Sequence, residues 1–167
     1  MSTAAPSHSQ HTHRPSPAWL TAGRRSIIAH VSLYLGALAV LATGVAHIEQ
    51  YAVDNYSTVP TIGTLFLLNF VGAIVIAVGL VAPIRRVAGR YTDAVRALFA
   101  VGGIGLGALS LVALFISEGS SLFGFHENGY RMAIVSAIVA EVAAIVFLLV
   151  FLVANGTGLQ KIRRSSR

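Results

Sequence analysis

Four long apolar segments, separated by short polar connections, constrain this chain more than any other feature. A helix that crosses the hydrocarbon core of a bilayer needs about 20 predominantly apolar residues. The segments that meet this requirement are residues 26–47, 61–82, 95–116 and 132–154. Each is apolar on all sides, as expected for a helix that contacts both lipid and other helices. The sequence therefore predicts an all-α protein with four transmembrane helices.

The composition agrees with a membrane protein. Hydrophobic residues make up 55% of the chain and charged residues only 11%, whereas a soluble domain carries about 25% charged residues. The net charge of +6 does not indicate nucleic-acid binding, because the basic residues lie between apolar segments and form no basic face with interleaved aromatics. The absence of cysteine excludes disulfides, thiolate metal sites and thiol catalysis.

The basic residues predict the orientation of the helices. Of the 12 Lys and Arg residues, all except Arg131 fall on one side of the predicted bundle, which the positive-inside rule assigns to the cytoplasm. Short connections make consecutive helices antiparallel neighbours. We therefore expect an up-down-up-down four-helix bundle in the cell membrane with both termini in the cytoplasm. The eleven residues on the cytoplasmic side are Arg14, Arg24, Arg25, Arg85, Arg86, Arg90, Arg96, Lys161, Arg163, Arg164 and Arg167.

The same pattern divides the chain into three parts. Residues 1–25 are rich in Ser, Pro, His and Thr and too polar to bury a core, which predicts a disordered cytoplasmic tail. Residues 26–154 form the predicted transmembrane domain. Residues 155–167 form a basic cytoplasmic tail.

Glu141 is the most informative single residue. It lies nine residues past Met132 in the fourth apolar segment, which places it near the middle of the bilayer. An acidic side chain at that depth costs about 2.5–3.5 kcal/mol to insert and usually faces the bundle interior. One interpretation is a protonatable site for a proton relay, a cationic substrate or a cofactor. The other is a protonated carboxyl with a structural role, hydrogen-bonded to a neighbouring helix.

Asn69 is the predicted partner of Glu141. The second and fourth segments run in the same direction, and Asn69 lies eight residues past Thr61, at nearly the depth of Glu141. A side-chain amide both donates to and accepts from a carboxyl, so the two residues predict a polar core between helices. Ser110 and Thr43 are expected to join this core from the other two helices.

A second group of polar residues is expected on the outer face. It consists of His47, Glu49, His126 and Glu127, from the two outer connections. Histidine with carboxylate suits a metal ion, and two histidines on different helices suit haem. The spacing contains no tight ligand motif, so the alternative is a set of solvated loop residues with His47 at a helix C-terminus.

Gly103 and Gly107 form a G-x-x-x-G pattern inside the third apolar segment. Small residues at this spacing let two helices approach closely. The contact is expected either within the bundle or between two copies of the chain.

Two segments carry a resemblance to known proteins. One is His47-Ile48-Glu49-Gln50-Tyr51, followed by the run from Val59 to Asn69, and the other runs from Phe123 to Gly129 into the helix that holds Glu141. Over residues 30–153 the chain resembles uncharacterised actinobacterial four-span membrane proteins and, more distantly, DoxX-like four-helix proteins. The DoxX likeness implies an association with quinone-linked redox enzymes.

Three functions fit the sequence. The first is a non-enzymatic membrane component, a partner protein or subunit with a Glu141–Asn69 polar core. The second is a small, oligomeric, proton-coupled transporter that uses Glu141. The third is a haem- or quinone-associated redox subunit that uses His47 and His126. The expected partners are the lipid bilayer and either another membrane protein or a second copy of the chain.

Overall fold

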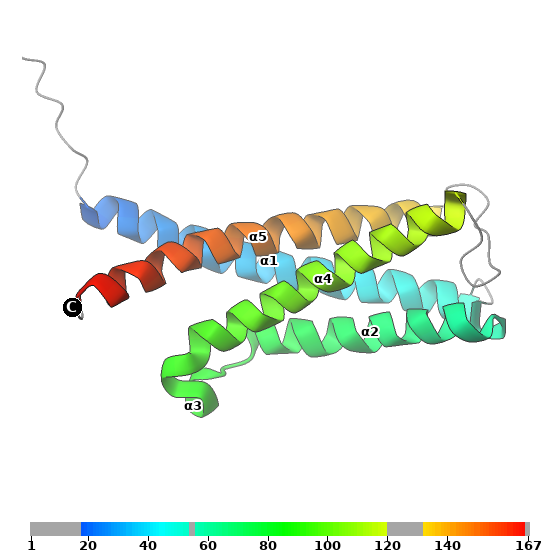
Figure 1. Ribbon diagram of the computed structural model, residues 1–167, viewed down its shortest axis with the longest axis horizontal. Coiled ribbons are helices and arrows are strands. Elements are labelled where there is room, and N and C mark those ends of the chain that lie inside the picture. Colours follow the sequence, from blue (N-terminus) through cyan, green and yellow to red (C-terminus); the bar gives the residue numbers. More distant parts are fainter. Residues whose placement is uncertain (1–17, 54–55, 120–131, 166–167) are drawn as a thin grey trace, which may run out of the picture.

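The computed structural model describes residues 18–53, 56–119 and 132–165, and all of its regular structure is helical. Four long helices make up most of the chain (Figure 1). They are α1 (Ala18–Val53), α2 (Pro60–Val81), α4 (Thr92–Gly119) and α5 (Met132–Ser165). A short helix η1 (Tyr56–Thr58) precedes α2, and α3 (Arg85–Ala88) with η2 (Gly89–Tyr91) connects α2 to α4. Within the described residues, the prediction of an all-α protein with four long apolar helices is confirmed.

Local sequence explains where these helices begin and end. Pro60 stands in the first turn of α2, where its missing N–H removes no helical hydrogen bond. Pro83 follows the end of α2 and cannot continue it. Gly89 adopts a φ of 49° between α3 and α4, a backbone region that favours glycine. The hydroxyl of Thr92 then donates to the Gly89 carbonyl oxygen at 2.7 Å, at the start of α4.

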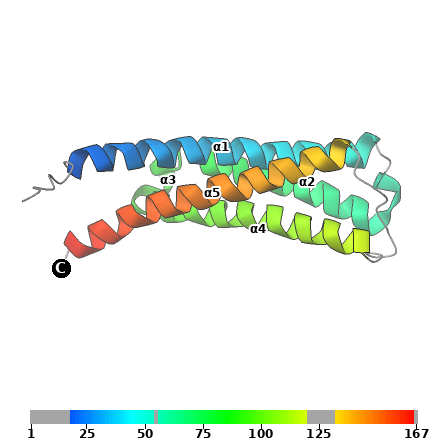
Figure 2. The same ribbon diagram turned by 90° about the horizontal axis from the view of Figure 1, so that it is seen from above.

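The four long helices lie side by side with a consistent pattern of neighbours. Helix α1 packs along α2 and α5, and α4 packs along α2 and α5, whereas α1 and α4 barely touch. The beginning of α1 and the end of α5 lie at the end of the molecule where α3 also lies (Figures 1 and 2). The core between the helices contains many small side chains, among them Ala37, Ala73 and Ala144.

The G-x-x-x-G pattern packs inside the bundle. A Cβ atom at Gly103 would lie 2.6 Å from the Leu148 side chain of α5 and 3.2 Å from Val40 of α1. A Cβ at Gly107 would lie 3.3 Å from the backbone carbonyl oxygen of Glu141. Of the two contacts expected for this pattern, the structure shows the one within a single chain.

The outer surface of the helices identifies their environment. Large apolar side chains such as Leu38, Val75 and Leu109 are more than half exposed, although soluble proteins rarely expose wide apolar patches. Four segments of the described chain are long and apolar enough to cross a membrane. They are Ser26–Val53, Thr61–Val81, Arg85–Glu118 and Met132–Gly156. The chain is therefore a multi-pass membrane protein.

The first membrane segment differs from its expected bounds. We expected it to end near His47, but α1 continues to Val53, almost two further turns. Tyr51 and neighbouring polar residues interrupt the apolar run without breaking the helix, since no Gly or Pro occurs between Gly44 and Val53. This difference moves His47 from the predicted end of a helix to its interior.

Candidate functional site

His47 lies inside α1 and is only 6% exposed. Its Nδ1 atom is 2.9 Å from the backbone carbonyl oxygen of Thr43, one turn earlier. A carbonyl oxygen only accepts hydrogen bonds, so Nδ1 carries a proton in this geometry. It follows that Nε2 accepts a hydrogen bond when the ring is neutral and donates one when the ring is charged. The edge of the ring also packs against Phe66 of α2, with ring centroids 5.1 Å apart.

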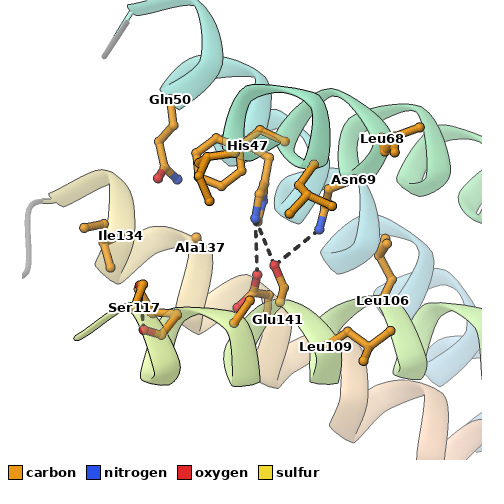
Figure 3. Close-up of a pocket in the computed structure, with 16 residues that line it drawn as sticks. His47, Gln50, Leu68, Asn69, Leu106, Leu109, Ser117, Ile134, Ala137 and Glu141 are labelled. Carbon is orange, nitrogen blue, oxygen red and sulfur yellow. Dashed lines mark hydrogen bonds and ion pairs between the residues drawn. The ribbon is translucent and has the colours of Figure 1, made fainter. Parts of the chain in front are cut away.

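The Nε2 atom of His47 meets side chains from two other helices. It lies 2.9 Å from the hydroxyl oxygen of Ser110 on α4 and 3.7 Å from Oε1 of Glu141 on α5. The three side chains come from three different helices, and Figure 3 shows His47 and Glu141 pointing toward one another. Glu141 is 2% exposed, and its carboxyl group also hydrogen-bonds to the Ser110 hydroxyl. The acidic group in the middle of the fourth span therefore has a basic partner, His47.

Asn69 joins this cluster through Ser110. Its side-chain Nδ2 donates to the Ser110 hydroxyl oxygen at 3.3 Å. Asn69 and Glu141 thus contact the same hydroxyl, which links them across the bundle. The other amide atom, Oδ1, is buried and has no hydrogen-bond partner among the described residues. We call the set His47, Asn69, Ser110 and Glu141 the polar cluster.

The polar cluster can hold one proton in two arrangements. In the first, Glu141 carries the proton and donates to Ser110, whose hydroxyl donates to the neutral Nε2 of His47. In the second, His47 carries it and donates to Ser110, whose hydroxyl donates to the Glu141 carboxylate. The serine oxygen has two lone pairs, so it accepts from Asn69 in both arrangements. The two states interconvert when the Glu141 proton passes to the Ser110 oxygen while the Ser110 hydroxyl proton passes to Nε2 of His47, or the reverse.

A cavity of about 290 Å³ lies beside the polar cluster. Every member of the cluster lines it, together with Gln50 of α1. The rest of its wall is mainly aliphatic and comes from α2, α4 and α5. A mostly apolar cavity with a few convergent polar groups is the usual form of a small-molecule site. The aliphatic and aromatic wall residues are Ile62, Leu65, Phe66, Leu68, Leu106, Leu109, Ala113, Leu114, Ile134 and Ala137.

The predicted polar core differs in one member from the observed cluster. Asn69, Ser110 and Glu141 come together, but the hydroxyl of Thr43 donates to Ala39 of its own helix at 3.2 Å. Thr43 contributes its backbone carbonyl, which positions His47. His47 replaces Thr43 as the fourth side chain. The sequence contains a pattern that could have indicated His47. Thr43, His47 and Gln50 are spaced four and three residues apart, which places them on one face of a helix, and in the structure all three are buried.

Two members of the predicted outer-face group, His47 and Glu49, lie in the described part of the chain. His47 is buried in α1, so its interpretation as a solvated loop residue is wrong. Glu49 is exposed. His126 and Glu127 lie outside the described residues, as do the N-terminal tail histidines. Among the residues that the structure describes, no three His, Asp or Glu side chains are grouped closely enough to hold a metal ion.

Comparison of the chain with protein-family models, with curated proteins and with solved structures finds no match. The polar cluster and the cavity are therefore the features that indicate a function.

Proposed function

We propose that this protein is a non-enzymatic membrane component that binds a small molecule in the cavity beside the polar cluster. The observation that carries the proposal is the combination of a cavity of about 290 Å³ with the polar cluster at its wall, of which His47, Asn69 and Glu141 are buried and Ser110 is half-buried. A polar core that only holds helices together has no need of an adjoining cavity. Glu141 and His47 would exchange a proton with the polar end of the bound molecule or with each other.

The proposal includes the placement of the bundle in the cell membrane. We propose an up-down-up-down topology with both termini in the cytoplasm. Support comes from the positive charges, since Arg85, Arg86 and Arg90 lie in the connection between α2 and α4 and cytoplasmic loops are enriched in such residues. In this orientation the cavity lies toward the outer half of the bundle.

The experiment compares two substitutions at adjacent positions of α4. Ala113 lines the cavity, so Ala113→Trp fills it. Val112 is 53% exposed and does not line the cavity, so Val112→Trp is the matched control. Each protein is extracted from its native membrane in mild detergent, and organic extracts are compared by mass spectrometry. We expect a small molecule that is retained by the wild type and by Val112→Trp but lost in Ala113→Trp. Identical extracts from all three proteins would contradict the proposal.

Proton-coupled transport is the second candidate function, because His47 and Glu141 lie 3.7 Å apart and both line the cavity. In proteoliposomes, accumulation of the retained molecule would then respond to an imposed pH gradient. Glu141→Gln would abolish that response while leaving binding in place. A redox subunit with haem held by His47 is less well supported, because Nδ1 and Nε2 of His47 already contact Thr43 and Ser110.

A further inference from the structure

The side of the cavity between α2 and α4 is lined by exposed leucines. Leu68 is 61% exposed and Leu109 is 73% exposed, and both line the cavity. Leu65, also on the α2 side, is 42% exposed. In a membrane-spanning bundle, exposed side chains at this depth face lipid. The cavity therefore has an apolar mouth on the hydrocarbon side.

The polar part of the cavity lining includes Asn69, which follows Leu68 on α2. Asn69 is 9% exposed, and its Oδ1 atom is a hydrogen-bond acceptor without a partner among the described residues. Its Nδ2 atom already donates to Ser110, and this fixes which end of the amide is left over. Leaving a buried acceptor unpaired is unfavourable. A group that completes this site must be a donor.

On these two observations, we infer that the cavity takes a lipid-soluble alcohol or phenol that enters from the bilayer between α2 and α4. Because Oδ1 is buried, a small shift of the Asn69 amide accompanies binding. The ligand hydroxyl then donates to Oδ1, and the apolar part of the ligand lies against the leucine side chains at the mouth. The inference rests on the proposed function, since it names the chemical class of the bound molecule. It also gives Asn69 a role of its own, as a residue that selects for a hydroxyl donor.

The first experiment uses a matched pair of probes, naphthol and methoxynaphthalene, which differ in whether the oxygen carries a proton. Binding of each tritiated probe to the full chain in lipid nanodiscs is measured by scintillation proximity, with empty nanodiscs as the blank for partitioning. We expect naphthol to bind the wild type more tightly by about fivefold or more, which corresponds to about 1 kcal/mol. Equal affinities for the two probes would overturn the inference.

Asn69→Leu tests which residue makes the distinction. We expect this variant to bind naphthol no more tightly than methoxynaphthalene, whereas its affinity for methoxynaphthalene equals that of the wild type. A preference that persists in Asn69→Leu would assign the hydroxyl to another partner and overturn the role of Asn69. The comparison of the two probes on the wild type stands without any variant, so poor folding of Asn69→Leu does not leave the ligand class undecided.

The route of entry has its own test. Tryptophan in place of both Leu68 and Leu109 is expected to slow naphthol association by about tenfold or more, as restricted access does. The control carries tryptophan at Val71 and Val112, which are exposed on the same two helices but do not line the cavity. Equal association rates in the two double variants would rule out entry between α2 and α4.

These outcomes separate the inference from the proposed function. If both probes bind equally and Ala113→Trp abolishes both, the cavity is a binding site and the inferred ligand class is wrong. If probe binding is unchanged in Ala113→Trp, the probes bind outside the cavity. Both the inference and the proposed function would then be wrong.

Discussion

Gly107 of α4 packs directly against the backbone carbonyl of Glu141 on α5, leaving only 3.3 Å for a Cβ atom. It lies one helical turn before Ser110, so this close approach holds the Ser110 hydroxyl beside the Glu141 carboxyl and the Nε2 atom of His47. The polar cluster therefore depends on a position that has no side chain.

Substitution of Gly107 by leucine is expected to destabilise the bundle. The new side chain would force α4 away from α5, and such overpacking typically costs about 1–3 kcal/mol. Gly105 is the matched control, because a Cβ there meets nothing within 4 Å and Gly105→Leu makes the same change in helix propensity. Thermal unfolding in detergent should show a lower midpoint for Gly107→Leu alone. Equal midpoints in the two variants would contradict the close packing.

Ser110→Ala is expected to destabilise the protein by about 1–3 kcal/mol, because it leaves both Nε2 of His47 and Nδ2 of Asn69 without their partner. Ser136→Ala is the control, since that exposed hydroxyl donates only to Ala133 of its own helix. Unfolding in a denaturing detergent measures both. If the two substitutions have the same small effect, Ser110 is not the centre of a hydrogen-bonded cluster.

Glu141→Gln should remove an infrared signal without unfolding the protein. The amide keeps hydrogen-bonding groups at this position but cannot carry the exchangeable proton. In the wild type, a pH difference spectrum should contain a protonated carboxyl band from the buried site, together with an imidazole band. The chain has six histidines, so only the carboxyl band is specific to this site. We expect that band to disappear in Glu141→Gln and to remain in Glu49→Gln, where the lost carboxyl is exposed. A carboxyl band that survives in Glu141→Gln would show that another acidic group holds the proton.

A preparation purified without added cofactor is expected to show no haem absorption. Nδ1 of His47 is 2.9 Å from the Thr43 carbonyl oxygen and Nε2 is 2.9 Å from the Ser110 hydroxyl, so ligation would require breaking one of these contacts. The visible spectrum decides this. A haem band that is present in the wild type and lost in His47→Ala would show that His47 ligates haem, and would favour the function as a redox subunit.

The proposed orientation can be tested with single cysteines, because the natural chain contains none. Val53 at the end of α1 is 70% exposed, and Val87 in α3 is 93% exposed. A membrane-impermeant maleimide applied to intact spheroplasts should label Val53→Cys, whereas Val87→Cys should be labelled only after lysis. The reverse labelling pattern would show that the bundle has the opposite orientation in the membrane.

The four helices and part of the polar cluster could be predicted from the sequence. Long apolar segments indicate the spans directly. Nearly equal distances from the starts of their segments place Asn69 and Glu141 at similar depth. The approach of His47 to Glu141 could not be predicted in this way. We expected the first span to end at His47, because hydropathy falls there. In the structure α1 continues to Val53, and His47 is a buried residue in the interior of this helix.

The cavity is a different case, because no sequence pattern indicates it. It depends on how far apart α2 and α4 lie, and side-chain packing along both helices sets that distance. Gly107 shows why the sequence is ambiguous here. A G-x-x-x-G pattern indicates a close contact, but it does not say which helix approaches or that the contact positions Ser110.

Ser110 belongs to α4, which lies in the least buried of the four membrane segments and barely touches α1. The link from Asn69 to His47 thus crosses the α2–α4 gap through a single hydroxyl. We expect a molecule that widens this gap to stretch the 3.3 Å contact between Asn69 and Ser110 before it disturbs the packing of α1 on α5. The position of α4 would therefore link the filling of the cavity to proton transfer between Glu141 and His47 through the Ser110 hydroxyl.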